Sequence, residues 1–265
     1  MTTDARRAFH ALHESGTFLL PNPWDVGSAK LLEQLGAVAL ATTSSGFAAT
    51  LGRNDQEVTR DELVAHVAAL TAAVSVPVNV DAERGYATDP TGVAETVELL
   101  AAAGASGVSI EDYDPATGVV DPLDVAVERI AAAAEVCARH GIVLTGRAEN
   151  HLYGITDLDD TVARLNAYRE AGAGCVYAPG LSDLADIARV VAGTGAPVNV
   201  LALPNGPSVP ELAGVGVRRV STGGSLAWAA YGALVTATRE LQETGTSTYL
   251  TRALPRDLRD AAFGG

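Results

Sequence analysis

Acidic side chains recur in this sequence directly after short apolar segments, where strands are expected to end. Asp81 and Glu83 follow Pro77–Val80, and Glu111 follows Gly107–Ile110. Because side chains on a strand share a face every second residue, Asp81 and Glu83 are predicted to point together, with Glu111 about 5 Å away on the next strand. Carboxylates this close repel one another, and a divalent cation such as magnesium relieves the repulsion. Pairing with arginines or helix capping is the alternative interpretation.

Basic residues follow another apolar segment, Ile142–Thr145. Arg147 is well suited to bind a substrate carboxylate through paired hydrogen bonds, although an ion pair with Glu149 or Glu111 fits the same position. His151 follows in the same loop and is a candidate acid or base, with a surface histidine as an equal alternative.

Two glycine-containing turns also follow apolar segments. Ser45-Gly46-Phe47 offers backbone N–H groups and a hydroxyl that can bind a carboxylate or an enolate oxygen, although a plain loop has the same composition. The turn from Ser221 to Gly224 fits either a phosphate site or the tight turn that a barrel needs at this point.

Eight apolar segments rich in Val, Ile and Leu position these residues, and each is followed by a polar or Gly/Pro break and a helical pattern. Their continuous apolar character is typical of parallel strands that are buried on both faces. Eight strand–helix alternations in 265 residues predict a single (β/α)8 TIM-type barrel, one domain spanning 1–265, with its active site at the carboxyl ends of the strands. The segments are Thr17–Leu20, Ala37–Thr43, Pro77–Val80, Gly107–Ile110, Ile142–Thr145, Cys175–Ala178, Pro197–Leu203 and Arg218–Ser221.

Helix-start signals occur between these segments. Thr59 and Glu62 form a capping box, and Asp89-Pro90 and Asp121-Pro122 place a proline at a first helical position. Ser182 is the predicted N-cap of a later helix.

The composition narrows the classes of partner. A net charge of −14 with only one lysine argues against nucleic acid and against an anionic membrane surface. No apolar run reaches the roughly 18 residues of a membrane span, and the first 17 residues lack the apolar core of a signal peptide. We therefore expect a cytoplasmic protein without a membrane anchor, in which both cysteines are reduced core residues.

Taken together, the motifs resemble the isocitrate lyase/phosphoenolpyruvate mutase superfamily from about Leu19 to Ala237. The motifs that carry the resemblance are Asn22-Pro23-Trp24-Asp25 with Ser28-Ala29, Ser45-Gly46-Phe47 with Asp55, Asp81-Ala82-Glu83-Arg84-Gly85-Tyr86, Ser109-Ile110-Glu111-Asp112, Arg147 and Pro179-Gly180.

The resemblance implies a (β/α)8 barrel, commonly a homotetramer built from dimers that swap the C-terminal helix. It implies a magnesium ion, with manganese as the alternative, held largely through water by the acids matching Asp55, Asp81, Glu83 and Glu111. It also implies a 2-oxo acid or its enolate as ligand. The implied ligand-binding residues are Trp24, Asp25, Ser45, Gly46, Phe47 and Arg147.

The sequence departs from the family pattern in two places. Glu83 stands where the family usually has Asp, and its longer side chain still reaches a metal bound through water. The loop 113–121 has no Cys, Lys or Arg, whereas the isocitrate and methylisocitrate lyases carry a catalytic Cys in this loop. A general acid that would protonate a leaving carbon is therefore missing from this loop.

These features predict a magnesium-dependent lyase or decarboxylase that acts on a small 2-oxo or 2-hydroxy acid, oxaloacetate-like or alkylmalate-like, through a pyruvate-type enolate. Decarboxylation is the simplest version, because CO2 leaves without the lost cysteine. Cleavage of a substituted malate would need a proton donor, for which Tyr86, Glu149 and His151 are the candidates. The alternatives are a phosphonopyruvate-type enzyme and a 2-oxo acid binding protein without catalysis.

Overall fold

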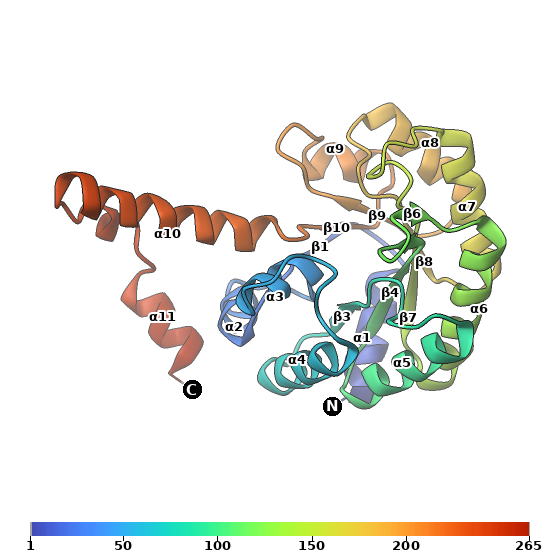
Figure 1. The fold of residues 1–265 in the computed structure, drawn as a ribbon, viewed down its shortest axis with the longest axis horizontal. Coiled ribbons are helices and arrows are strands. Elements are labelled where there is room, and N and C mark those ends of the chain that lie inside the picture. The colour runs from blue at the N-terminus through green and yellow to red at the C-terminus, as the bar shows by residue number, and fades with distance from the viewer. Residues whose placement is uncertain (1, 265) are drawn as a thin grey trace.

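The computed structural model describes residues 2–264, and its main feature is one parallel sheet of eight strands wound into a barrel (Figure 1). The strands are β1 (Phe18–Leu20), β2 (Leu40–Ala41), β3 (Val78–Asp81), β4 (Gly107–Glu111), β7 (Val143–Arg147), β8 (Cys175–Tyr177), β9 (Val198–Leu201) and β10 (Arg219–Ser221).

The sheet closes on itself. Its hydrogen-bonded order is β1, β10, β9, β8, β7, β4, β3, β2, so β1 and β2 are the two ends. These ends meet where the Ala41 amide donates to the Pro21 carbonyl at 3.1 Å and Asn22 Nδ2 donates to the Thr42 carbonyl at 2.7 Å. The predicted (β/α)8 barrel is thus confirmed.

Each of the eight predicted apolar segments coincides with one strand. Five strands are shorter than predicted, whereas β3, β4 and β7 run past their segments to Asp81, Glu111 and Arg147. Pro77 and Pro197 lie just outside β3 and β9, because proline has no N–H to donate to a neighbouring strand. Ala37–Thr43 shrinks most, to the two residues of β2.

Helices surround the barrel on its outer face (Figure 1). α1 (Thr2–Leu12) closes the amino-terminal end, where Arg6 donates to the carbonyls of Ala101, Ala105 and His140. The surrounding helices are α2 (Val26–Gln34), α4 (Arg60–Ala73), α5 (Pro90–Ala102), α6 (Leu123–His140), α7 (Leu158–Glu170), α8 (Leu184–Thr194) and α9 (Val209–Gly214).

Two of the four predicted helix starts are confirmed and two are shifted by one residue. Asp89 caps α5 with Pro90 at its first position, whereas Pro122 is itself the N-cap of α6, which begins at Leu123. Thr59 and Glu62 form the expected capping box of α4. Ser182 was predicted to cap α8, and this is wrong: Asp183 caps it, because its carboxylate accepts from two amides of the first turn and α8 begins at Leu184.

The barrel interior is unusually polar, whereas the layer between strands and helices is apolar. Arg219 on β10 donates to Thr145 on β7 at 2.9 Å. Since β9 and β8 separate these strands in the sheet, this bond crosses the interior. Barrel interiors are more often filled with Val, Ile and Leu. The polar side chains in this interior therefore indicate a role in binding or catalysis in addition to packing.

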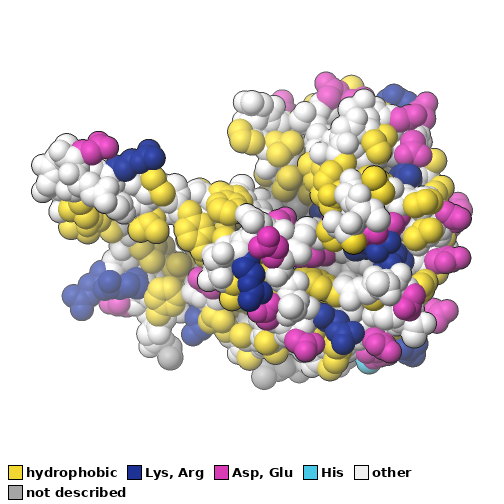
Figure 2. All heavy atoms as spheres, in the orientation of Figure 1, with side chains coloured by type: hydrophobic (Ala, Val, Ile, Leu, Met, Phe, Trp, Pro, Cys, Tyr) yellow, Lys and Arg dark blue, Asp and Glu magenta, His cyan; other side chains and the backbone are white. Residues whose placement is uncertain are grey.

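The last helices leave the barrel. α10 (Ser225–Thr244) projects away from it, and after a 3-10 turn (Thr248–Arg252) α11 (Arg256–Phe263) packs against α2 (Figure 1). Figure 2 shows hydrophobic side chains along this arm, and Trp228, Leu234 and Leu241 are among the exposed ones. Between residues 2 and 264, no helix combines the length and apolar character that a membrane span needs.

Candidate active site

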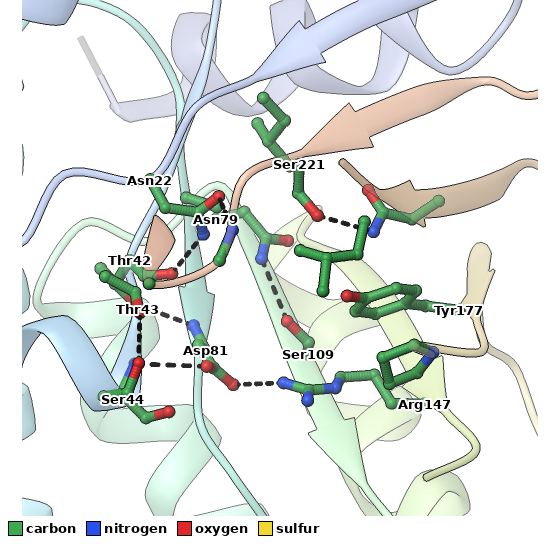
Figure 3. Close-up of a pocket in the computed structure, with 18 of the residues that line it drawn as sticks. Asn22, Thr42, Thr43, Ser44, Asn79, Asp81, Ser109, Arg147, Tyr177 and Ser221 are labelled. Atoms are coloured by element: carbon green, nitrogen blue, oxygen red, sulfur yellow. Dashed lines mark hydrogen bonds and ion pairs between the residues drawn. The ribbon is translucent and has the colours of Figure 1, made fainter. Parts of the chain in front are cut away.

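A cavity of about 150 Å3 lies inside the mouth of the barrel, at the carboxyl ends of the strands. Every strand of the barrel contributes at least one lining residue. Figure 3 shows Asp81, Arg147, Tyr177 and Ser221 around this space. An apolar cavity of similar size accommodates benzene, so this one suits a ligand of about six non-hydrogen atoms.

Arg147 is the centre of the polar contacts in this cavity. Its Nη1 donates to Asp81 Oδ1 at 2.7 Å, and its Nη2 lies 3.1 Å from Glu111 Oε2. Its Nε donates to Glu149 Oε1 at 2.9 Å. The ion pairs with Glu111 and Glu149 that the sequence left open are therefore formed, and Asp81 joins them.

Burial and mutual charge shift the pKa values of this cluster. Burial alone would lower the pKa of Arg147, but the carboxylates of Glu149, Glu111 and Asp81 raise it well above its usual value. Burial raises the pKa of Glu111 and of Glu149, and Arg147 opposes both shifts. The arginine therefore stays charged, and its positive charge opposes the rise that burial causes in the pKa values of Glu111 and Glu149.

A second group of acids stands beside the first. Loss of solvent and the nearby Asp81 carboxylate raise the pKa of Asp55. Burial raises the pKa of Glu83 to about 8, although the Tyr86 hydroxyl donates to Glu83 Oε1 at 2.8 Å and opposes the shift. Asp55 and Asp81 line the cavity. Glu83 and Glu111 are buried beside it and do not line it, although both lie close enough to Asp81 for its charge to raise their pKa values.

Backbone strain is concentrated in the same region. Among residues 2–264, the non-glycine residues with a left-handed backbone are Gln56 (φ 68°), Glu83 (φ 47°) and Tyr86 (φ 55°). Gln56 Nε2 donates to Glu111 Oε1 at 3.0 Å. Such conformations cost about 1–3 kcal/mol each and gather at functional sites, so they support the assignment of this mouth as the active site.

The Ser45-Gly46-Phe47 turn is the first turn of a short helix, α3 (Ser44–Thr50). Ser44 and Ser45 line the cavity, and the Ser44 amide donates to Asp81 Oδ2 at 3.3 Å. A side chain at Gly46 would approach Thr43 Cγ2 to 2.6 Å, so only glycine allows this close packing.

Three other predicted ligand-binding residues have structural partners. Asp25 caps α2 through the Ser28 amide at 2.7 Å. The Phe47 ring stacks on His66 with 3.8 Å between ring centroids. Trp24 is partly buried and lies next to Gly46: a methyl group at Gly46 would be only 3.1 Å from Trp24 Cβ.

The loop 113–121, which lacks the catalytic cysteine, forms a small hairpin of β5 (Tyr113–Asp114) and β6 (Val119–Val120). Arg84 holds it through Asp121 at 2.7 Å and Asp114 at 3.6 Å. Tyr113 stacks on Tyr153 at 3.7 Å. None of the residues 113–121, all of which the structure describes, lines the cavity.

The predicted proton donors lie around the cavity and do not line it. Tyr86 is bonded to Glu83, Glu149 to Arg147, and His151 Nε2 lies 2.9 Å from Thr161 Oγ1. Two lining residues, Tyr177 and Arg219, were assigned no role from the sequence. The available signals were a hydroxyl-bearing ring at the end of one strand and an arginine inside another.

The donor set fits a hydrated divalent ion better than a directly ligated one. In the part of the chain that the structure describes, no three His, Cys, Asp or Glu side chains form a direct metal cluster. Burial is the largest cause of the raised pKa values of Asp55, Glu83 and Glu111, and neighbouring carboxylates raise them further, so a nearby cation would stabilise the charged forms. Oxygen ligands that act through water suit magnesium.

Comparison with known proteins places this geometry among related enzymes. The sequence pattern of the family described as phosphoenolpyruvate phosphomutase matches residues 9–242. A protein of Burkholderia cenocepacia, described provisionally as a lyase/mutase, is 46% identical with a TM-score of 0.95, covering 100% of this chain and 97% of that one.

Two relatives have named activities. The oxaloacetate decarboxylase of Bradyrhizobium diazoefficiens is 31% identical over 204 residues, which are 74% of this chain and 70% of the relative. The structure of a 2,3-dimethylmalate lyase is 26% identical with a TM-score of 0.85, covering 99% of this chain and 94% of that chain. Both relatives are named as enzymes that cleave carbon–carbon bonds.

Proposed function

This chain belongs to the phosphoenolpyruvate phosphomutase family, and we propose that it is a carbon–carbon lyase for a small 2-oxo or 2-hydroxy acid. Decarboxylation of an oxaloacetate-like acid is its simplest reaction. The observation that carries the proposal is a small cavity lined by Arg147 and Asp81, outside which the loop 113–121 lies without Cys, Lys or Arg. The similarity to oxaloacetate decarboxylases supports the same reaction.

Magnesium, or manganese in its place, is part of this proposal. Asp55, Asp81, Glu83 and Glu111 would hold the ion, largely through water. A bound ion of this kind polarises an oxo group and stabilises an enolate.

The protein's own groups bind and orient the substrate. A guanidinium has five N–H donors, so Arg147 retains donors for a ligand carboxylate while its carboxylate partners stay in place. The first turn of α3 presents Ser44 and Ser45 to the same space. The electrons of the broken C–C bond pass to the pyruvate enolate, which takes its proton from solvent, so the reaction needs no acid from the loop 113–121.

The test is pyruvate release from a panel of oxaloacetate, 2-methylmalate, 2,3-dimethylmalate, methylisocitrate and phosphonopyruvate, with magnesium and then with EDTA. Free magnesium decarboxylates oxaloacetate slowly, so Asp81→Ala protein at equal magnesium is the control. Pyruvate and CO2 from oxaloacetate, lost in the variant, would support the proposal. Equal rates with both proteins would refute the assigned site.

A second candidate is cleavage of a substituted malate, which the similarity to 2,3-dimethylmalate lyase favours. Pyruvate with a second carbonyl compound or acid as co-product would identify it. Turnover of phosphonopyruvate alone would indicate a phosphonate-processing enzyme. Binding of pyruvate or oxalate without any turnover would indicate a binding protein.

We also propose that α10 is covered by a second copy of the chain, as the family's swapped C-terminal helix implies. Trp228, Leu234, Val235 and Leu241 are 53%, 61%, 46% and 44% exposed in the single chain. Light scattering coupled to size exclusion would show a dimer or tetramer. A monomer at micromolar concentration would contradict the swap.

A further inference from the structure

Arg219 is a buried arginine on β10 that has no carboxylate partner in residues 2–264. It is 2% exposed and lines the cavity. Its Nε donates to Asn199 Oδ1 at 3.0 Å and its Nη2 to Thr145 Oγ1 at 2.9 Å. Its Nη1 lies 3.4 Å from His13 Nε2. A guanidinium has five N–H donors, so these three contacts leave one N–H on each terminal nitrogen for a ligand.

The partners of Arg219 are neutral, so none of them is a counter-ion for its charge. Burial and the charge of Arg219 lower the pKa of His13 to about 3, so its ring is neutral at pH 7. Burial also lowers the pKa of Arg219, and the groups that oppose this shift are Cys175 and Tyr177 rather than carboxylates. Buried charges in proteins are normally paired. A negative group is therefore expected to approach Arg219 from the cavity.

Arg219 reaches a polar layer that lies deeper in the barrel than Arg147. Thr145, its contact on β7, stands two residues before Arg147, which is about 6–7 Å along a strand. Asn79 and Ser109 also line the cavity and are joined by a hydrogen bond of 3.1 Å (Figure 3). The deep end of the cavity thus offers neutral polar side chains around one positive charge.

The two ends of the cavity therefore differ in charge. At the mouth, Arg147 is paired with the three carboxylates of Asp81, Glu111 and Glu149, which exceed its charge. At the deep end, the charge of Arg219 is not neutralised by its partners. Opposite charges attract more strongly away from bulk water. A ligand that reaches from the mouth to Arg219 is consequently bound most tightly when its deep end is anionic.

We infer that Arg219 binds a carboxylate of the ligand, so that the cavity selects short dicarboxylates with one carboxylate at Arg147 and the other at Arg219. The remaining N–H groups of Arg219 supply charge-assisted hydrogen bonds to the carboxylate oxygens. A monocarboxylate of equal size leaves Arg219 without an anion and binds more weakly. The identity of the substrate as an oxaloacetate-like acid rests on the proposed function, whereas the preference for two carboxylates does not.

The first experiment compares the binding of malonate and 3-methylbutyrate to wild type by calorimetry at equal free magnesium. The two compounds have the same number of non-hydrogen atoms, and an isopropyl group in 3-methylbutyrate replaces the second carboxylate of malonate. Because hydrogen bonds to charged groups are strong, wild type should bind malonate about 10- to 100-fold more tightly. Equal affinities, or no binding of malonate, would overturn the inference.

The decisive variant is Arg219→Met, which removes the charge and keeps a long side chain. Its affinity for malonate should fall about 10- to 100-fold, and its affinity for 3-methylbutyrate should change less than about threefold. Arg219→Lys retains the charge and should recover most of the preference for malonate. A preference that persists in Arg219→Met would place the second carboxylate elsewhere. An equal loss of both ligands would show that Arg219 only shapes the cavity, and either result would overturn the inference.

The matched control is Arg6→Met on α1, which removes one positive charge at the amino-terminal end of the barrel. Arg6 donates to the carbonyls of Ala101, Ala105 and His140 and does not line the cavity. Its variant should bind malonate as wild type does. A loss as large as that of Arg219→Met would mean that affinity follows the net charge of the protein, which would contradict a binding role for Arg219.

These binding measurements separate the inference from the proposed function, because none of them needs turnover. Malonate binding that depends on Arg219, in a protein that releases no pyruvate from the panel, would refute the proposed function and support the inference. Decarboxylation of oxaloacetate with the same kcat/KM in wild type and Arg219→Met would support the proposed function and overturn the inference.

Discussion

The barrel holds two buried arginines with opposite surroundings. Arg147, at the mouth, is bonded to the carboxylates of Asp81, Glu111 and Glu149. Arg219, deeper inside, is bonded to neutral Asn199 and Thr145. The Arg147 side chain is 13% exposed and Arg219 is 2% exposed, so the main difference lies in the charge of their partners.

The two sets of partners suit different roles for the two arginines. The Arg147 guanidinium is held by three carboxylates and lines the cavity, so a charged ligand can bind to it there. Arg219 donates hydrogen bonds to neutral partners, Asn199 and Thr145, so no anion neutralises its charge there. A buried charge without a counter-ion is expensive, and the acceptors Asn199, Thr145 and His13 offset part of that cost.

The largest expected effect is that of Arg147→Met. It leaves three buried carboxylates unpaired, so the free energy of unfolding should fall by about 3–5 kcal/mol at pH 7, and turnover should fall by about 10³-fold. Because burial raises the pKa values of Glu111 and Glu149, these two groups ionise further with rising pH, and the deficit should grow from pH 7 to pH 9 in urea unfolding.

Arg219→Met is the comparison for that experiment. It leaves no carboxylate unpaired, and His13 is neutral in both folded and unfolded chains above pH 7, so its deficit should stay constant over the same range. A deficit that grows equally in both variants would remove the distinction between the two arginines.

Removal of magnesium should abolish the stabilisation that oxalate binding at the barrel mouth gives to the folded state. With magnesium and oxalate at 100 times their dissociation constant, the folded state should gain about 2.7 kcal/mol, seen as a higher thermal midpoint that EDTA reverses. Asp81→Ala should show no such gain. A gain that persists in EDTA would disprove the need for the ion.

The bottom of the barrel should respond to acid through His13. Its pKa is lowered to about 3 in the folded protein, while an unfolded histidine titrates near pH 6.5. The unfolded chain therefore takes up a proton first, so stability is complete above about pH 6.5 and is lost as the pH falls toward 3, by up to about 1.4 kcal/mol per pH unit.

His13→Gln keeps an acceptor for Arg219 and a donor for Phe9, and it should flatten this acid dependence in urea unfolding between pH 6.5 and 5. His66, whose pKa burial lowers to about 4, contributes equally to both proteins. Parallel curves for wild type and variant would show that His13 is not buried as a neutral ring.

The smallest expected effect is that of Glu83→Asp. Aspartate adopts the left-handed backbone of this position (φ 47°) more readily than glutamate, although it moves away from the Tyr86 hydroxyl. Because contact with the ion through water tolerates a shorter side chain, kcat/KM should change by less than about threefold. A tenfold loss would place Glu83 in direct contact with the reacting groups.

Much of the site was predictable because it depends on strand ends. Asp81 and Glu111 could be placed at the mouth, since parallel strands end on the same side. The partners of Arg147 could not be chosen from the sequence, and neither could those of Arg219. The loop 113–121 was predicted to be short and acidic, while its attachment to Arg84 appeared only in the structure.

The sequence by itself determined the barrel, because the alternation of apolar segments and helical patterns is a local property of the chain. It also placed Asp81 and Glu111 at the mouth, because each ends a parallel strand. The prediction that Glu83 shares a strand face with Asp81 is wrong, because β3 ends at Asp81 and Glu83 has a left-handed backbone. Only the tertiary structure decided that Arg219 reaches Thr145, which is 74 residues away in the sequence. The physical reason is that distances across a closed barrel depend on how its strands are staggered, and no local pattern records that stagger.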